Sequence, residues 1–405
     1  MMNTLSNLLQ PYPVEQFLHE NWAQQGILIS GNQPSRFDHL FSWHQFNHLL
    51  NFHRLREPQL RFVLDQKDMS FANPQEGVRR CKAGASIVLS RVNELVPQIA
   101  DLIWSLQEDL GHRKIHANVY CSWPGHQGFH CHYDTHEVFI LQLEGEKEWF
   151  VFEDTLKYPY RQETWDSREP PKSEPYIHSV LKPGDLLYIP RGHWHYAIAQ
   201  NQPSLHLTIG VLCLKGADLL TWLAETLQQP EIWRKNLPLF SQGETEPLEE
   251  YTRRLIDHLV GTLQAEKQHL SQEFARVHRM QGFRDAEVSL PMQVGFGLFA
   301  QELNTPLRLA QFLKVRLEPL PEGSYQLVAG DKTVTFKQLP PEFVKQLMEF
   351  VLSGQIFTPN EIAQKLPNYS LDTVIIPILA GLIKEGVLIE DDPIYTDRNR
   401  NQIID

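Results

Sequence analysis

GFHCHYDTHEVFILQLEGEKEWFVF, residues 128–152, is the stretch of this sequence that decides the fold. Side chains two positions apart in a β-strand point to the same face, so His132 and Asp134 can reach one metal ion. Taken alone the pair favours an accidental match, because a chain with 18 histidines produces some His-x-Asp pairs by chance. A metal site on this strand therefore needs a third ligand from elsewhere in the chain.

A second histidine-rich segment follows about sixty residues later, in LKPGDLLYIPRGHWHYAIA, residues 181–199. Pro183 and Gly184 predict a turn, after which an apolar strand leads to His195, the expected third ligand. Two imidazoles and one carboxylate on one face of Fe(II) leave three positions open for a bidentate 2-oxo acid and O2. A structural zinc site would instead be closed by four ligands.

The spacing alone leaves open which histidines bind the metal. His130 and His136 have the same strand parity as His132, and His193 has the parity of His195. We expect these three histidines to be hydrogen-bond partners of the ligands or contacts of the substrate.

Short apolar or aromatic runs, separated by turn residues, fill the chain from about Lys114 to Leu214. They are IHANVYCSW, EVFILQL, EWFVF, GDLLYIP, HYAIA and LHLTIGVL. This pattern predicts an antiparallel all-β unit, a sandwich or a barrel. Because Gly145 lies between VFILQL and EWFVF, we expect these two runs to pair as a hairpin.

Helical periodicity flanks this block on both sides. Apolar residues at spacings of three and four predict a helix over 93–110, and a longer apolar stripe predicts a helix over 247–280. So long a helix needs a packing partner, and a homodimer is one hypothesis. Three further helices, expected at 341–353, 359–366 and 370–385 and followed by the extended run VLIE, suggest a winged-helix module. Pro377 is expected to kink the last of them.

The net charge of −12 argues against a general affinity for phosphate backbones. We therefore expect no direct nucleic-acid binding, and any such contact would have to be local. The four cysteines contain no Cys-x-x-Cys pair, which indicates reduced thiols in a cytoplasmic protein. Neither a signal peptide nor an apolar run of membrane-spanning length is recognisable.

The stretch NVYCSWPGHQGFHCHYDTHEVFILQLEGEKEW, with the later PGDLLYIPRGHWH, resembles the cupin-like JmjC family of ribosomal oxygenases. The resemblance implies an α+β fold, in which a double-stranded β-helix (the cupin or JmjC jelly roll) precedes a helical region and a C-terminal winged-helix-like module. We expect a catalytic domain over 1–214 that includes an N-terminal helical and extended segment. A helical dimerisation region over 215–335 and the winged-helix-like domain over 336–405 should follow.

The resemblance also assigns roles to single residues. It makes His132, Asp134 and His195 the iron ligands, and it matches Lys147 to the family's lysine that binds the distal carboxylate of 2-oxoglutarate. Outside this motif, a lysine in such a turn would be interpreted as a solvated charge.

Three more positions match residues of the family's pocket. Asn118 and Thr208 correspond to positions that line the co-substrate pocket, and Tyr120 corresponds to a tyrosine near the substrate. For Asn118 and Thr208 the alternative is a polar side chain that satisfies hydrogen bonds at a strand end.

The resemblance implies an Fe(II) and 2-oxoglutarate dependent oxygenase that hydroxylates a side chain of a protein, with a ribosomal protein as the expected substrate. The same triad would also serve the oxidation of a small molecule or a short peptide, whereas the motif subtype disfavours N-methyl-lysine demethylation. A non-catalytic, metal-binding cupin is the alternative from another class. An intact triad together with Lys147 speaks against it, and the sequence does not name the substrate.

Overall fold

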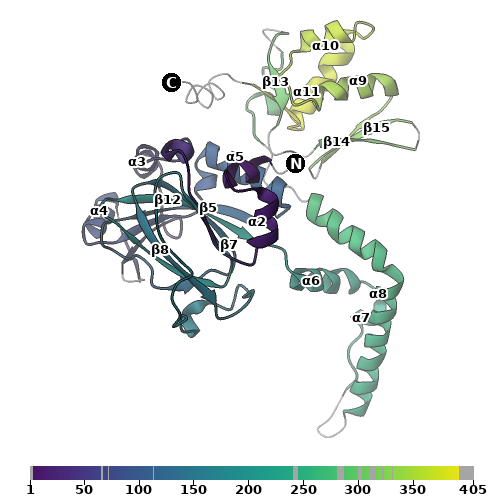
Figure 1. Cartoon of the computed structure of the whole chain (residues 1–405). Helices are drawn as coiled ribbons and strands as arrows, with labels where there is room; N and C mark the ends of the chain where they lie inside the picture. The colour runs from purple at the N-terminus through teal and green to yellow at the C-terminus, as the bar shows by residue number, and fades with distance from the viewer. Residues whose placement is uncertain are drawn as a thin grey trace. The chain divides into compact units, whose positions relative to one another are not determined.

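The computed structural model describes residues 3–64, 67–71, 73–112, 114–239, 245–280, 287–299, 303–310, 313, 315–321, 323–330 and 332–391. The chain divides into two compact units, and the boundary between them falls after Cys213. Each unit is described by itself (Figure 1).

Two antiparallel β-sheets form the framework of the first unit. The larger sheet has the strand order β1-β10-β7-β12-β5-β4-β2-β3, and the smaller has the order β6-β11-β8-β9. The strands of the larger sheet are β1 (Ile27–Ile29), β2 (Leu60–Leu64), β3 (Lys67–Met69), β4 (Ser86–Leu89), β5 (Lys114–Ser122), β7 (Glu137–Glu144), β10 (Leu186–Ile189) and β12 (Ser204–Leu212). Those of the smaller sheet are β6 (His132–Tyr133), β8 (Lys147–Asp154), β9 (Ile177–Leu181) and β11 (His193–Ala199).

Helices precede and interrupt the strands of this unit. They are α1 (Asn3–Leu9), α2 (Val14–Glu20), α3 (Trp43–Phe52), α4 (Pro74–Lys82) and α5 (Pro97–Leu110). The predicted helix over 93–110 is confirmed as α5 but begins later, because Val92–Glu94 form a separate 3-10 turn and Pro97 opens the helix. It ends where predicted, at Leu110, and is capped by Gly111, whose φ is +67°.

Strand β7 packs against a different apolar cluster on each of its two faces. Phe139 and Leu141 point toward the cluster that includes residues of α1, α2 and α5. Val138 and Ile140 point the other way, toward Trp149 and neighbours from the smaller sheet. Because alternate side chains of a strand face opposite sides, an uninterrupted apolar run such as EVFILQL marks a strand that is buried on both faces.

The predicted hairpin between VFILQL and EWFVF is wrong. β7 pairs with β10 and β12 in the larger sheet, whereas β8 pairs with β11 and β9 in the smaller one. Gly145, at φ +70°, lies in the turn that carries the chain from one sheet to the other, and a side chain there would collide with the Pro203 carbonyl. The apolar pattern of each strand is therefore satisfied by burial between sheets and not by pairing of the two strands.

The second unit begins with α6 (Gly216–Leu227), α7 (Glu231–Arg234) and α8 (Glu246–Met280), and α8 confirms the long helix predicted over 247–280. The helices predicted near the C-terminus are confirmed as α9 (Pro341–Val351), α10 (Pro359–Lys365) and α11 (Ile376–Lys384). A π-helical turn, Leu371–Ile375, precedes α11 and Pro377, where the irregularity was expected. None of the helices among the described residues is long and apolar enough to cross a membrane.

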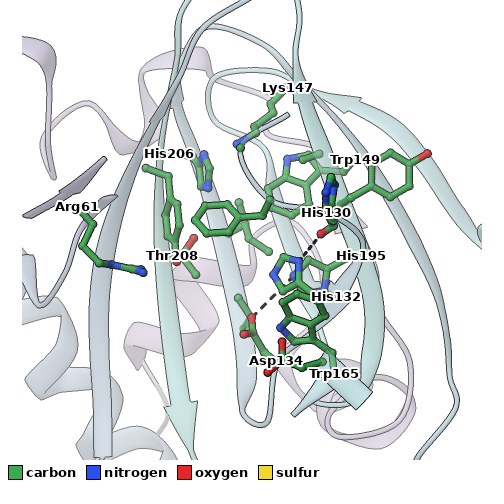
Figure 2. Close-up of a pocket in the computed structure, with 18 residues that line it drawn as sticks. Arg61, His130, His132, Asp134, Lys147, Trp149, Trp165, His195, His206 and Thr208 are labelled. Carbon is green, nitrogen blue, oxygen red and sulfur yellow. Dashed lines mark hydrogen bonds and ion pairs between the residues drawn. The ribbon is translucent and has the colours of Figure 1, made fainter. Parts of the chain in front are cut away.

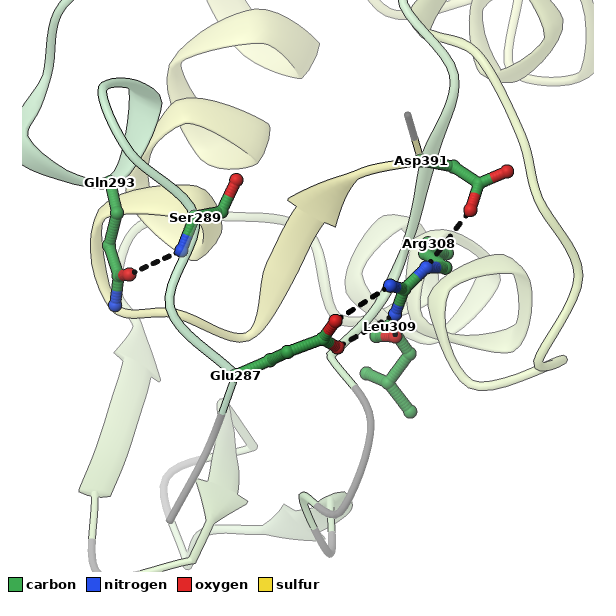
Figure 3. A network of polar contacts seen from close by, with 6 residues as sticks. All are labelled: Glu287, Ser289, Gln293, Arg308, Leu309 and Asp391. Atoms are coloured by element: carbon green, nitrogen blue, oxygen red, sulfur yellow. Dashed lines mark hydrogen bonds and ion pairs between the residues drawn. The ribbon is translucent and has the colours of Figure 1, made fainter. Parts of the chain in front are cut away.

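Two small sheets complete the second unit. β13 (Leu307–Leu309) pairs with β17 (Leu388–Glu390), and β14 (Val315–Pro319), β15 (Tyr325–Ala329) and β16 (Lys332–Phe336) form a three-stranded sheet. Arg308 of β13 holds this part together by binding both carboxylate oxygens of Glu287, at 2.8 and 2.9 Å, and one oxygen of Asp391, at 3.0 Å (Figure 3). The forked guanidinium is suited to such double recognition.

Replacement of Arg308 with Ala is expected to destabilise the second unit by about 2–3 kcal/mol, because it leaves the buried carboxylate of Asp391 without its cation. Hydrogen exchange of the β13 and β17 amides should then accelerate. Arg316→Ala is the control, since the Arg316 side chain is 52% exposed and its ion pair with Glu318 is worth little. Equal exchange in both variants would contradict this assignment.

Candidate active site

His132, Asp134 and His195 come together at one point in the first unit, as the sequence predicts. β11 pairs with β6 so that His195 lies directly opposite His132. The rings of the two histidines have centroids 4.4 Å apart, and Nε2 of His195 lies 3.8 Å from Oδ2 of Asp134. One potential ligand atom from each residue lies within 4.8 Å of the others, which fits a group that can hold a metal ion.

Backbone carbonyls orient both imidazoles. Nδ1 of His132 donates to the carbonyl of His130 at 2.7 Å, and Nδ1 of His195 donates to the carbonyl of His193 at 3.1 Å. Because a carbonyl only accepts, each Nδ1 must carry the proton, and each Nε2 is left with its lone pair for a metal. His130 and His193 therefore support the ligands through their main chains.

The electrostatics of the triad favour metal binding. Burial alone would raise the pKa of Asp134, but His136, His195 and His132 lie close enough to hold that pKa below its usual value. Burial, reinforced by His132, lowers the pKa of His195 to about 4. The site thus offers an ionised carboxylate and a neutral imidazole, which are the forms that bind divalent metals.

The extra histidines of the HCHYDTHE stretch do not join the triad. Strand β6 contains only His132 and Tyr133, so the alternation of a strand does not extend to His136. The ring of His136 lies 5.5 Å from the ring of His116. The side chain of His193 turns toward Tyr176, whose hydroxyl lies 2.8 Å from its Nδ1, at an irregularity in the β11 and β8 register. His193 also forms a second group of potential metal ligands together with Glu153 and Asp154.

The triad opens into a cavity of about 470 Å³, within the size range of ligand pockets (Figure 2). Val138, Ile140 and Trp149 form an apolar wall, and Arg61, Trp165 and Asp166 also contribute to the lining. The cavity therefore combines one apolar wall with charged and polar side chains that can hold a metal and a polar co-substrate.

Lys147 lines the same cavity and is not a solvated turn charge. It is the first residue of β8, is only 7% exposed, and donates from Nζ to the Ser122 hydroxyl at 3.1 Å. Its ammonium also lies 5.6 Å from the centre of the Trp149 ring. Burial lowers the pKa of Lys147 to about 7. No carboxylate pairs with it among the described residues, so the cavity is suited to an anion that supplies the missing charge.

Sequence reasoning missed His206, which lies beside Lys147. The ring is 2% exposed, stacks on Tyr120 with centroids 5.1 Å apart, and leaves its Nδ1 without a hydrogen-bond partner in the described structure. Trp149 has a similarly unpartnered indole nitrogen. Strand parity could have found His206, because it precedes Thr208 by two positions on β12.

The remaining predicted pocket residues divide into two groups. Thr208 and Tyr120 line the cavity, and burial raises the pKa of Tyr120 to about 12, so its hydroxyl stays protonated. Asn118 is the strand neighbour of Thr208 but does not belong to the described lining. Its side-chain oxygen accepts from the backbone N–H of Arg91 at 2.9 Å, the strand-end hydrogen bond that was the alternative for this residue.

The family model of the JmjC domain matches residues 94–219, which include the triad and Lys147. The chain is 30% identical over 253 residues to a bifunctional lysine-specific demethylase and histidyl-hydroxylase NO66 of Drosophila persimilis, covering 58% of this chain and 36% of the relative. It is 32% identical over 213 residues to ribosomal oxygenase 1 of Rattus norvegicus, covering 50% of this chain and 36% of the relative. The chain thus spans about a third of the length of these relatives.

The fold is similar to that of the ribosomal oxygenase YcfD from Escherichia coli, solved with cobalt and 2-oxoglutarate. The two chains are 18% identical with a TM-score of 0.53, and the match covers 94% of this chain and 99% of that one. A second structure of YcfD matches with a TM-score of 0.52 at 19% identity, over 94% and 98% of the two chains. The predicted resemblance is confirmed: the chain has a JmjC cupin fold of mixed helices and antiparallel sheets, and residues 94–219 match the JmjC domain family.

Proposed function

We propose that this chain is an Fe(II) and 2-oxoglutarate dependent oxygenase that hydroxylates a side chain of a ribosomal protein. The observation that carries the proposal is the buried ammonium of Lys147, which lines the same cavity as the triad of His132, Asp134 and His195. A module that merely binds a metal has no need of a buried cation in that cavity. The similarity to proteins named ribosomal oxygenases and histidyl-hydroxylases supports a ribosomal substrate and a histidine as the modified residue.

In this proposal the triad would hold Fe(II) and Lys147 would bind the distal carboxylate of 2-oxoglutarate. The two-histidine, one-carboxylate donor set fits Fe(II), and the orphaned nitrogen of His206 fits a carboxylate that accepts hydrogen bonds. When bound, the metal and co-substrate supply oxidation by O2, with conversion of 2-oxoglutarate to succinate and CO2.

The chain's own residues would orient the groups that bind the metal and the co-substrate. The carbonyls of His130 and His193 keep the two imidazoles turned toward the metal position, and Ser122 holds the ammonium of Lys147 in place. Thr208 and Tyr120 contribute hydroxyls to the same cavity.

Turnover without a substrate tests the proposal. Purified protein with Fe(II), ascorbate and 2-oxoglutarate should form succinate slowly, and faster once ribosomal proteins are added. Mass spectrometry of ribosomal proteins from cells with and without the enzyme should then find one protein that gains a single oxygen, with fragmentation locating it. Loss of a methyl group from lysine would point to demethylation. No succinate, with or without ribosomal proteins, would favour a non-catalytic metal-binding cupin. Succinate formation stimulated only by small molecules or short peptides would favour an oxygenase that acts on such substrates.

The affinity for 2-oxoglutarate is expected to fall above neutral pH. Because burial lowers the pKa of Lys147 to about 7 in the free protein, the side chain loses its charge above that value and must take up a proton to bind a carboxylate. The apparent Kd, measured by calorimetry, should rise up to about tenfold per pH unit between pH 7 and 9. Lys147→Arg should flatten this dependence because a guanidinium stays charged. A Kd for 2-oxoglutarate that does not change with pH in the unmodified protein would contradict the proposed role of the Lys147 charge.

We also propose that the helical region forms a homodimer. No residue of α6 is buried, and Leu219 and Leu223 of α6 line an apolar groove with Leu263 and Phe274 of α8. The mass in solution should be twice that of the chain. Leu223→Asp should weaken the dimer at least about tenfold, since a desolvated charge costs more than the 1.4 kcal/mol that a tenfold change represents. Leu220→Asp is the control, because Leu220 is 68% exposed and lies outside the described groove. A monomeric unmodified protein would sink this proposal.

The finer organisation of the chain is likewise proposed. We infer domains over 1–214, 215–335 and 336–405, and a winged-helix identity for the last is supported by the order α9, α10, α11 and β17. A role in protein contacts suits its excess of carboxylates. A cytoplasmic location is supported by four cysteines, all in described segments, that form no disulfide.

A further inference from the structure

A second cleft, of about 1040 Å³, lies on the first unit between the end of α3, the segment that follows it, and α4. Leu60 and Phe62 of β2 line this cleft, whereas Arg61 between them lines the cavity of the candidate active site. Since alternate residues of a strand face opposite sides, the cleft is on the other face of β2 from the metal position. It is a separate site.

Cations that form no ion pair with a described residue surround the cleft, and Glu57 is the one described carboxylate in its lining. Arg54 and Arg56 line it, and Gln75, Val78 and Cys81 of α4 turn toward it. Arg79 and Lys82 are exposed and lie four and seven positions after Gln75, so they flank the same face of the helix. None of these four cations forms an ion pair with a described residue, although the chain carries a net charge of −12. In a protein with surplus carboxylates, four cations left unpaired around one cleft indicate an anionic partner.

An exposed aromatic ring stands beside these cations. Phe52, at the end of α3, is 77% exposed and lines the cleft. His48 lies one helical turn earlier with its ring 4.8 Å from that of Phe52, and the exposed ring of His53 follows. The carboxylate side chains of an acidic peptide have no aromatic face to stack on such rings, whereas every nucleobase has one, and base stacking on aromatic side chains is sequence-tolerant.

Side-chain amides complete the surface. Asn47 and Gln75 are exposed at the cleft, and an amide both donates and accepts hydrogen bonds, as the edges of unpaired bases require. Cations for phosphates, rings for stacking and amides for base edges are the three contacts that single-stranded nucleic acid makes with proteins.

We propose that this cleft binds single-stranded RNA through Arg54, Arg56, Arg79 and Lys82, with Phe52 as a stacking surface. The choice of RNA over DNA rests on the proposed function, because the proposed substrate is a ribosomal protein and ribosomal proteins bind RNA. The net negative charge of the chain then limits binding to this one local surface.

Fluorescence anisotropy with a labelled twelve-nucleotide uridine RNA, titrated with the full chain between 50 and 200 mM salt, tests the proposal. Four phosphate contacts predict a slope of log K against log salt of about −3, since each contact on a single strand contributes about −0.7. The double variant Arg54→Gln, Arg56→Gln should halve this slope and weaken binding at least about tenfold at 50 mM salt. Phe52→Ala should weaken binding about tenfold without changing the slope, because stacking involves no counterions.

Arg161→Gln with Lys172→Gln is the matched control, since it removes two exposed cations of the same unit away from the cleft. This control variant should keep both the salt slope and the RNA affinity within about twofold of the unmodified protein. All substituted side chains are exposed, and circular dichroism checks that each variant folds.

Three results would overturn the proposal: no RNA binding at 50 mM salt, equal losses in the cleft and control variants, or equally tight binding of a poly-glutamate peptide of the same charge. The assay needs no iron, co-substrate or turnover. A failure to bind RNA therefore leaves the proposed oxygenase activity untouched. A protein that binds RNA but forms no succinate would contradict the proposed activity and leave the RNA site standing.

Discussion

Asp134→Ala is expected to abolish tight Fe(II) binding and to reduce succinate formation by more than about 100-fold. Loss of a hydrogen-bond partner of a ligand already reduces metal affinity 10- to 100-fold, and loss of a ligand itself should exceed that. Asp134 is also the only carboxylate of the triad, so the variant removes the charge that offsets the metal's. Metal content after dialysis and succinate yield measure the two effects independently.

Asp166→Ala is the matched control for Asp134. It removes another carboxylate from the lining of the same cavity but none of the three potential ligand atoms. Metal content should stay at the level of the unmodified protein. If Asp134→Ala retained its iron while Asp154→Ala lost it, the metal would belong to the second group of potential ligands, at Glu153, Asp154 and His193, and the assignment of the triad would be wrong.

Lys147→Ala is expected to raise the Kd for 2-oxoglutarate by about 100-fold, which corresponds to about 2.8 kcal/mol. Removing one partner of a buried charge pair costs 2–5 kcal/mol or more, because the other charge stays in a medium of low dielectric constant. Metal content should be unchanged, since Nζ of Lys147 bonds to Ser122 and not to a residue of the triad. Calorimetry with the metal-loaded protein measures the affinity.

Lys182→Ala serves as the control for Lys147, because Lys182 is exposed and lies next to Leu181, the strand partner of Lys147. The Kd of the Lys182→Ala variant for 2-oxoglutarate should match that of the unmodified protein. A Lys147→Ala protein that binds 2-oxoglutarate normally would show that His206 or another group holds the distal carboxylate. Loss of metal in the same variant would instead indicate a structural role for Lys147.

The sequence located the candidate metal group because its evidence is local. A strand makes residues two positions apart share a face, so His132 and Asp134 were predictable from spacing. The single strand expected to run from the Pro183 turn to His195 is instead two strands, β10 in the larger sheet and β11 in the smaller. The structure nevertheless pairs His195 with His132. Long helices were equally predictable, since the periodicity of α5 and α8 is a property of the segment itself.

Other features depended on which strands meet in space. The turn at Gly145 has the composition of a hairpin, yet β7 and β8 belong to different sheets, and only burial of both faces of β7 decides this. His136 shares the parity of His132 but lies beyond the two-residue strand β6, so its ring turns toward His116. Strand parity with Thr208 could have placed His206 on the same face, but only the tertiary structure brings it near Lys147, which lies on another strand of the other sheet.

By itself the sequence determined the residue types and spacings of a candidate metal triad, the alternation of a β-rich block and the stripe of a long helix, since each is set by neighbours along the chain. Tertiary structure alone decided that Lys147 is buried, that Asn118 bonds to a backbone N–H, and that Arg54, Arg56 and the exposed Phe52 line one cleft. The physical reason is that burial and the local electrostatic environment depend on residues distant in sequence, which only the fold brings together.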